Sequence, residues 1–293
     1  MKGIILAGGN GSRIYPITLA AVKPLLPIYD KPMIYYSLTN LLSFGIKDIA
    51  IISQEENLPK YRVLFGDGSR FGINIQYLIQ KEPRGIADSF IIAEDFIGND
   101  SVCLILGDNI FHLTDEQKIC DYVANFRKGG TIFGYRVSDP ERYGVIEFDD
   151  DNRVISIEEK PKNPKSSIAS VGLYIYDNQV VEIAKNLKFS DRGELEITEV
   201  STHYLNKNQL NVINLASGSA WLDAGVPEAM IEAAQYVHTL EKRQGVSIGC
   251  PEEIALRNGY ITAKQLYDFA NSIPGKSSYK QYLIKVSQDA SYN

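Results

Sequence analysis

The chain has 293 residues, of which 44% are hydrophobic, and its formal net charge is −6. That length suffices for one large α/β domain with a sizeable core. The acidic balance argues against a nucleic-acid partner, since such binding requires a basic face. No signal peptide is recognisable, and no stretch approaches the roughly 20 apolar residues of a membrane-spanning helix, so we expect no membrane association.

Three cysteines, Cys103, Cys120 and Cys250, stand at unrelated spacings, and none belongs to a CxxC pair. An odd number without a pattern indicates neither a disulfide framework nor a metal knuckle. Free cysteines of this kind are usually small buried side chains. The cysteine content therefore predicts a protein of the reducing cytoplasm.

Short β-branched runs recur through the first two thirds of the chain. They predict strands at residues 3–6, 49–53, 73–79, 102–106, 131–137, 145–148, 154–158 and 171–176. Helical patterns lie between many of them, at residues 32–44, 61–65, 86–96, 115–127 and 179–186. The first of these has proline in its first turn and glycine just past its end. This alternation predicts an α/β fold with a doubly wound, mostly parallel, Rossmann-like sheet that binds ligands beyond the carboxyl ends of its strands.

The pattern changes after about residue 225. Residues 227–244 have the period of a long amphipathic helix, and residues 251–286 contain shorter helical pieces without strands. We therefore expect an α/β domain over residues 1–225 and a C-terminal helical appendage over residues 226–293.

A glycine-rich turn follows the first strand, with the sequence Leu6-Ala7-Gly8-Gly9-Asn10-Gly11-Ser12-Arg13. Glycines let the backbone approach a polyphosphate and point N–H groups at it, and Arg13 adds a planar cation. The turn lacks the Lys-Ser/Thr of a Walker A loop, and Ile14 replaces the last small residue of a dinucleotide fingerprint. A plain strand-to-loop turn remains the alternative interpretation.

Lys23 is a second candidate cation. It lies in the sequence Lys-Pro-Leu-Leu-Pro at residues 23–27, where prolines favour extended backbone and can fix a cation relative to the glycine turn. The alternative is a solvated surface lysine.

Two aspartates are candidate metal ligands. Asp108 follows the apolar run 102–106, so it is expected at the ligand-binding edge of the sheet, and Asp223 follows Trp221 and Leu222 in a similar position. Two carboxylates brought together suit Mg²⁺, which prefers one or two carboxylates plus phosphate oxygens and water. Either residue alone could instead be a helix cap or a turn residue.

Eight sequence blocks resemble the glucose-1-phosphate thymidylyltransferases, a family of sugar nucleotidyltransferases, in family order over essentially the whole chain. They are GIILAGG at 3–9 with Gly11 and Arg13, Lys23 with LLP at 25–27, YDKPMIYY at 29–36, LGDN at 106–109, DPERYGV at 139–145, EEKP at 158–161, RGELEIT at 192–198 and WLD at 221–223.

This resemblance implies that dTTP and glucose 1-phosphate give dTDP-glucose and pyrophosphate with the help of Mg²⁺, in a homotetramer. The implied nucleotide site comprises Leu6, Ala7, Gly8, Gly9, Gly11, Ser12, Arg13, Gln80, Gly85 and Asp108. The implied sugar-phosphate site comprises Asn109, Tyr143, Gly144, Glu159, Lys160 and Ser170. The implied metal ligands are Asp108 and Asp223, and the implied catalytic groups are Arg13, Lys23, Lys160 and Asp108.

The identity of the base and of the sugar stays open at this point. The amide of Gln80 can pair with a pyrimidine edge, but uracil presents the same edge as thymine. Ala87-Asp88-Ser89 also replaces the Ala-Gln-Ala that is usual in the family near the base and the sugar. The alternatives are the same chemistry with UTP or another sugar 1-phosphate, and a sugar-nucleotide sensor without catalysis.

Overall fold

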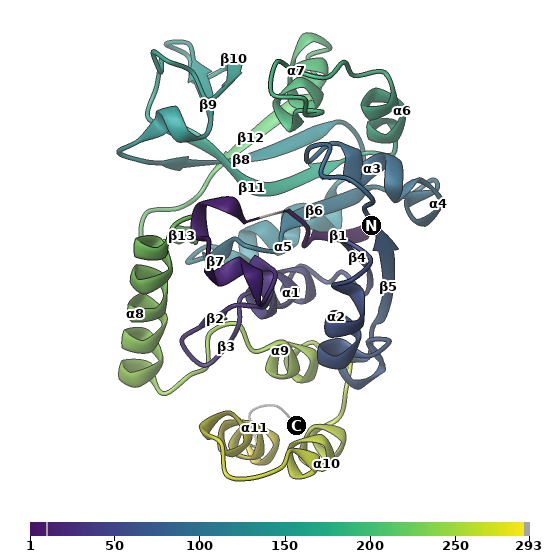
Figure 1. Cartoon of the computed structure of the whole chain (residues 1–293), viewed down its shortest axis with the longest axis vertical. Helices are drawn as coiled ribbons and strands as arrows, with labels where there is room; N and C mark the ends of the chain where they lie inside the picture. The colour runs from purple at the N-terminus through teal and green to yellow at the C-terminus, as the bar shows by residue number, and fades with distance from the viewer. Residues whose placement is uncertain (10, 290–293) are drawn as a thin grey trace.

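The computed structural model describes residues 1–9 and 11–289, and within them a nine-stranded sheet crosses the molecule (Figure 1). Its main path has the strand order β10-β9-β11-β6-β1-β4-β5, and β8 and β12 continue from β11. These strands are β1 (Lys2–Leu6), β4 (Asp48–Ser53), β5 (Asn74–Ile79), β6 (Val102–Leu106), β8 (Gly130–Arg136), β9 (Gly144–Phe148), β10 (Val154–Glu159), β11 (Ile168–Tyr176) and β12 (Leu210–Asn214). Two small ladders pair β2 (Pro27–Ile28) with β3 (Lys31–Pro32) and β7 (Ile110–His112) with β13 (Ala220–Leu222).

Helices lie on both faces of the sheet, and α10 and α11 form one end of the molecule (Figure 1). They are α1 (Ile34–Ser43), α2 (Leu58–Phe65), α3 (Asp88–Ile92), α4 (Glu94–Ile97), α5 (Glu116–Asn125), α6 (Gln179–Lys185), α7 (Ile197–Asn206), α8 (Pro227–Gln244), α9 (Pro251–Arg257), α10 (Ala263–Ser272) and α11 (Ser278–Gln288). Among the described residues, no helix is both long and apolar enough to cross a membrane.

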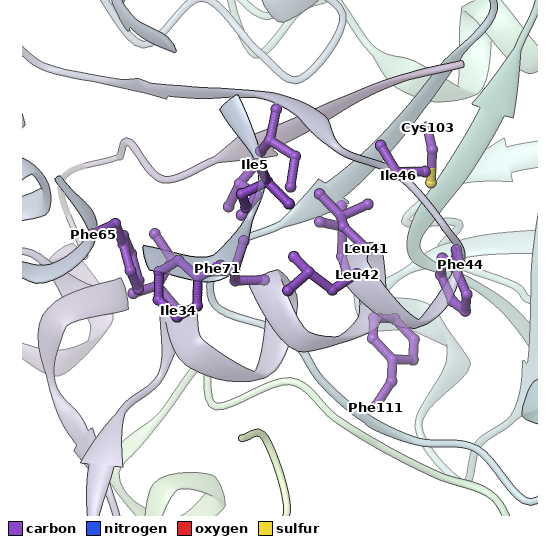
Figure 2. Packing of buried hydrophobic residues seen from close by; sticks show 14 of the residues in the cluster. Ile5, Ile34, Leu41, Leu42, Phe44, Ile46, Phe65, Phe71, Cys103 and Phe111 are labelled. Carbon is purple, nitrogen blue, oxygen red and sulfur yellow. The ribbon is translucent and has the colours of Figure 1, made fainter. Parts of the chain in front are cut away.

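The strands β5, β4, β1 and β6 are parallel neighbours, and they confirm the expected α/β fold. The apolar runs of β1, β4 and β6 are continuous because these strands are buried on both faces, whereas the edge strand β5 has exposed Asn74 and Gln76 on either side of buried Ile75. Successive residues then serve opposite faces, so Ile4 packs in the core beneath α3, α6 and α7, whereas Ile5 packs in the core beneath α1, α2 and α5. Figure 2 shows Ile5 above Leu41 and Leu42 of α1 in this second core.

Two strands, β10 and β11, run opposite to the parallel strands, since β11 is antiparallel to β6 and β9, and β10 is antiparallel to β9. β11 is also antiparallel to β8, and it begins at Ile168, three residues before the predicted start. A β-branched run has the same two-residue period in either direction, so the sequence pattern carries no sign of this reversal.

Three predicted helices need correction. Pro32 lies in β3 rather than in a first helical turn, and α1 starts only at Ile34. The helix predicted for residues 86–96 is two short helices separated at Ala93, whose backbone (φ −95°, ψ 15°) leaves the helical range. α2 starts at Leu58, three residues early, because Pro59 can occupy a first helical turn.

The C-terminal helices follow the expected pattern, and α8 has the predicted bounds. Leu256 of α9, Leu266 of α10 and Leu283 of α11 are buried in the same core as α1 and α2. These helices therefore share the main hydrophobic core and cover it on the side away from β9 and β10 (Figure 1).

Truncation of the central strand β4 should destabilise the protein. Ile51 is completely buried, so Ile51→Ala should lower the free energy of unfolding by about 2–5 kcal/mol through lost burial and a cavity. Val63 on α2 is 84% exposed, so Val63→Ala should change the free energy of unfolding by less than about 0.5 kcal/mol. Denaturant melts of both variants measure the difference, and equal effects would contradict the assigned core.

Candidate active site

The glycine-rich turn and Asp108 leave the sheet side by side. Leu6 of β1 is paired with Leu106 of β6, and the N–H of Gly107 donates to the carbonyl of Leu6 at 2.9 Å. A Cβ on Gly107 would lie 3.2 Å from that of Ala7, so the two segments are in close contact. The expectation that Asp108 lies at the carboxyl edge of the parallel strands is thus confirmed by geometry.

The conformation of the turn requires its glycines. Gly9 has φ +100° and faces open space, because no described residue other than its chain neighbours lies within 4 Å of a Cβ built on it. Gly11 has φ +53°, and its Cβ would lie 2.5 Å from the side chain of Thr18. Ser12 then opens a single 3-10 turn, Ser12–Ile14, which presents Arg13 at the surface. Asn10 lies outside the described residues.

A cleft of about 300 Å³ opens over this edge, and we call it the glycine-turn cleft. Its lining is Leu6, Gly8, Gly9, Arg13, Gln80, Pro83, Gly85, Ile86, Leu106, Asp108 and Glu194. Ala7 lies beneath it, where its carbonyl accepts hydrogen bonds from Ser53 at 2.8 Å and Tyr61 at 2.9 Å. The structure therefore brings most of the predicted nucleotide residues together around one cleft.

Gln80 lies directly against the turn. Its side chain is buried, and Oε1 is 2.7 Å from the place where Gly8 would carry a Cβ. Any larger residue at position 8 would displace the amide, so the glycine leaves room for Gln80.

Lys23 forms an ion pair with Asp108, which lines the glycine-turn cleft. Lys23 Nζ is 2.6 Å from Asp108 Oδ2, and Asn109 Nδ2 donates to Asp108 Oδ1 at 2.9 Å. The side chain of Lys23 is only 11% exposed, which rules out the alternative of a solvated surface lysine. A cation and a carboxylate thus face each other near the point where the glycine turn leaves the sheet.

Tyr143, Gly144, Glu159, Lys160 and Ser170 gather on the antiparallel strands, and we call them the Glu159 cluster. Gly144 pairs with Glu159 in the β9–β10 ladder and with Ser170 in the β9–β11 ladder. A Cβ on Gly144 would lie 3.4 Å from Glu159 Oε2, so glycine leaves room beside that carboxylate. Lys160 follows in the left-handed region, with φ +45°, and its N–H donates to the carbonyl of Tyr143 at 3.0 Å.

Charges around Glu159 connect this cluster to the cleft. Burial raises the pKa of the Glu159 carboxyl, and the cations of Lys160 and Arg192 oppose that shift. Arg192 lies 3.2 Å from Glu159 and 2.9 Å from Glu194, which lines the glycine-turn cleft. Arg192 opens one of the eight matching blocks, but nothing in its local sequence indicates this link.

Asp223 does not follow a strand of the main sheet, as the sequence led us to expect; it follows β13, in the small antiparallel β7–β13 ladder. Leu222 pairs with Ile110 at the end of the ladder, so the chain passes from Leu222 into Asp223 beside Asn109 and Asp108. Trp221 Nε1 donates to Asn109 Oδ1 at 2.6 Å. This bond secures the two segments against each other.

Asp223 also adjoins the Glu159 cluster. Burial raises the pKa of Tyr143, and the Asp223 carboxylate adds to that shift. The rings of Tyr143 and Trp221 lie 5.0 Å apart, and Asp223 Oδ1 is 3.9 Å from Arg142. Among the described residues, no group of three or more His, Cys, Asp or Glu side chains is placed to hold a metal by itself.

Comparisons with known proteins agree with this arrangement. Residues 2–239 match the nucleotidyl transferase family. A glucose-1-phosphate thymidylyltransferase of Neisseria meningitidis is 50% identical over 286 residues, which is 98% of this chain and 99% of that protein. One of Mycolicibacterium smegmatis is 50% identical over 289 residues, with 98% and 99% of the two chains covered.

Solved structures share the fold. A Bacillus anthracis protein described as a glucose-1-phosphate thymidylyltransferase, crystallised with a sucrose, superposes with a TM-score of 0.75 at 42% identity, covering 80% of this chain and 94% of that one. A UDP-glucose pyrophosphorylase with bound UDP-glucose superposes with a TM-score of 0.69 at 24% identity, covering 81% and 98%, which supports the fold alone. The chain is a nucleotidyltransferase and belongs to the glucose-1-phosphate thymidylyltransferases.

Proposed function

We propose that this enzyme transfers a thymidylyl group from dTTP to α-D-glucose 1-phosphate and releases pyrophosphate. The observation that carries the proposal is the ion pair of Lys23 with Asp108 beside the glycine turn, because it puts cation and carboxylate where a triphosphate can enter. The Glu159 cluster, linked to that cleft through Arg192, supplies a second polar site for a sugar phosphate. The relatives' names agree with these two substrates.

The reaction is an in-line displacement. A phosphate oxygen of glucose 1-phosphate forms a bond to the α-phosphorus of dTTP, while the bond from that phosphorus to the oxygen bridging to the β-phosphorus breaks. The electron pair leaves with pyrophosphate. The attacking phosphate is already deprotonated at neutral pH, so no general base is needed, and catalysis is mainly positioning and charge stabilisation.

The side chains divide this work. Arg13 and Lys23 hold the triphosphate and stabilise the leaving pyrophosphate, and Lys160 holds the attacking phosphate. Gln80 and Gly85 bind the base, and the turn from Leu6 to Ser12 receives the phosphates with backbone N–H groups. The sugar is held by Asn109, Tyr143, Gly144, Glu159 and Ser170, whose hydrogen-bonding groups suit hydroxyls.

Asp108 and Asp223 would hold Mg²⁺. Each carboxylate pairs with a cation, Lys23 at 2.6 Å and Arg142 at 3.9 Å, and both carboxylate side chains are partly exposed, so a divalent ion and phosphate oxygens could reach them. Two carboxylates with room for phosphate oxygens are a donor set that Mg²⁺ accepts. When bound, the ion would neutralise charge on the phosphate oxygens.

We further propose the division into a nucleotidyltransferase domain, residues 1–225, and a C-terminal helical segment from residue 226 onward that contributes to a homotetramer. The packing of α9–α11 on the main core supports an attached segment rather than a separate unit. All three cysteines are free thiols, which agrees with a place in the reducing cytoplasm.

A substrate panel tests the proposed function. Pyrophosphate release is measured with dTTP, UTP, CTP, ATP and GTP, each against glucose, galactose, mannose and N-acetylglucosamine 1-phosphates. We expect the highest kcat/KM for dTTP with glucose 1-phosphate. A higher value for UTP or for another sugar would replace the substrate assignment, and measurable dTDP-glucose binding without any turnover would replace catalysis by a sensor role.

Asp108→Asn should abolish turnover without unfolding the chain. The change removes a carboxylate charge at the junction of the two sites, so kcat should fall by at least about a hundredfold. Asp95→Asn on the exposed side of α4 is the matched control and should leave kcat within about twofold. Near-normal kcat for Asp108→Asn at an unchanged melting temperature would remove this aspartate from the mechanism.

Gly9→Val should weaken dTTP binding. Apart from its chain neighbours, no described residue lies within 4 Å of the new Cβ, so the added side chain would meet the bound nucleotide rather than the protein. We expect about a tenfold loss in affinity, or about 1.4 kcal/mol, by calorimetry. Gly98→Val also places valine at a positive φ (+53°), in open space among residues that do not line the cleft, and its dTTP affinity should match that of the parent. Equal affinities for both variants would contradict the phosphate-binding turn.

A further inference from the structure

The segment between β5 and α3 forms one wall of the glycine-turn cleft. Gln80 starts it, and Pro83, Gly85 and Ile86 line the cleft opposite the glycine turn. Residues 81–84 are all exposed, so hydrophobic burial does little to fix this wall. Its position must come from specific bonds.

Backbone bonds fix its far half. The N–H of Leu195 donates to the carbonyl of Arg84 at 2.7 Å, and the N–H of Ala87 donates to the carbonyl of Leu195 at 3.2 Å. Between them, Gly85 has φ +103°, and its Cβ would lie 2.5 Å from the carbonyl oxygen of Leu195. The wall is thereby held against residue 195 at one short stretch.

A single ion pair adds a side-chain bond across this stretch. Asp88, in the first turn of α3, is 1% exposed, and its Oδ1 accepts a hydrogen bond from Nη2 of Arg84 at 2.6 Å. Among the described residues, Arg84 is the only side chain that pairs with Asp88. A buried carboxylate is costly without a partner, so Asp88 has a strong preference for this position of Arg84.

Asp88 itself stands on a well-anchored element. Phe90, two residues on, is completely buried, and its ring packs edge-on against Tyr176 of β11 at 5.7 Å. The Asp88 carboxylate is therefore held in place by α3. The side chain of Arg84, which is 46% exposed, reaches from the wall to this carboxylate.

We propose that Arg84 and Asp88 are positioning residues for the nucleobase. Their ion pair holds Pro83, Gly85 and Ile86 at the distance from Gln80 that fits thymine, and so contributes to the choice of thymine over uracil. The inference rests on the proposed function, because it assumes that the base enters this part of the cleft. Neither residue has to touch the ligand.

The expected effect is on the discrimination between thymine and uracil, and it is large enough to measure. Thymine and uracil differ by one methyl group, and a pocket that fits such a group discriminates by about 10–200-fold. A wall released from its ion pair packs less closely against that methyl. Loss of the pair should therefore lower discrimination and dTTP affinity while leaving the chemical step intact.

The test uses Asp88→Asn, Arg84→Gln and the double variant, with steady-state kinetics for dTTP and UTP. In each we expect the KM for dTTP to rise about tenfold, and the dTTP/UTP ratio of kcat/KM to fall at least about fivefold. kcat and the KM for glucose 1-phosphate should stay within about twofold. The double variant should be no worse than either single variant, since all three lose the same pair. Arg84→Lys, which keeps the cation, should restore part of the ratio.

Arg257→Gln is the matched control. Arg257 lies one helical turn from Glu253 on α9, 2.9 Å from its carboxylate, and this pair also joins a half-exposed arginine to a buried acid. The control can lower the melting temperature but should leave the dTTP/UTP ratio unchanged. If Asp88→Asn fails to fold, Arg84→Gln, which changes an exposed residue, carries the test alone.

Two outcomes overturn the inference. An unchanged KM and ratio in Arg84→Gln would make the pair a local stabiliser of α3, and an equal change in Arg257→Gln would make the effect one of general stability. Failure of the proposed function is distinct, because it would appear in the parent enzyme as absent turnover of dTTP with glucose 1-phosphate, and the inference would fall with it.

Discussion

The parallel pairing of β1 with β6 is the constraint on which the site depends. Its register brings the glycine turn and Asp108 to the same edge of the sheet, although about a hundred residues separate them in the chain. Negative charge concentrated there needs a partner, and Lys23 provides it at 2.6 Å. The triphosphate half of the site follows from these two facts.

The other half is built on different strands. β9, β10 and β11 run antiparallel, and their ladders collect Gly144, Glu159 and Ser170 at one point. Two links join this cluster to the parallel edge. Trp221, whose ring packs against Tyr143, donates to Asn109, and Arg192 lies between Glu159 and Glu194. A transfer between two substrates requires such a junction, since the reacting groups must be held at a fixed separation.

The sequence pattern predicted those features of the fold and the site that depend on neighbouring residues alone. The apolar strands, the long helix α8 and the glycine turn each have a sequence signature, and the position of Asp108 follows from the strand before it. The antiparallel direction of β11 has none, because pleat and composition do not depend on strand direction. The sequence pattern also could not show that Arg192 joins two sites or that Arg84 pairs with a buried Asp88. A solvated charged residue and a buried, paired one have the same sequence signature.

The most direct test of the account is a crystal structure of the enzyme soaked with dTTP and Mg²⁺. The account predicts phosphate density over residues 8–13, the metal between Asp108 and Asp223, and the base between Gln80 and the Pro83–Ile86 wall. Nucleotide density elsewhere, with the Lys23–Asp108 pair and the glycine turn untouched, would contradict it.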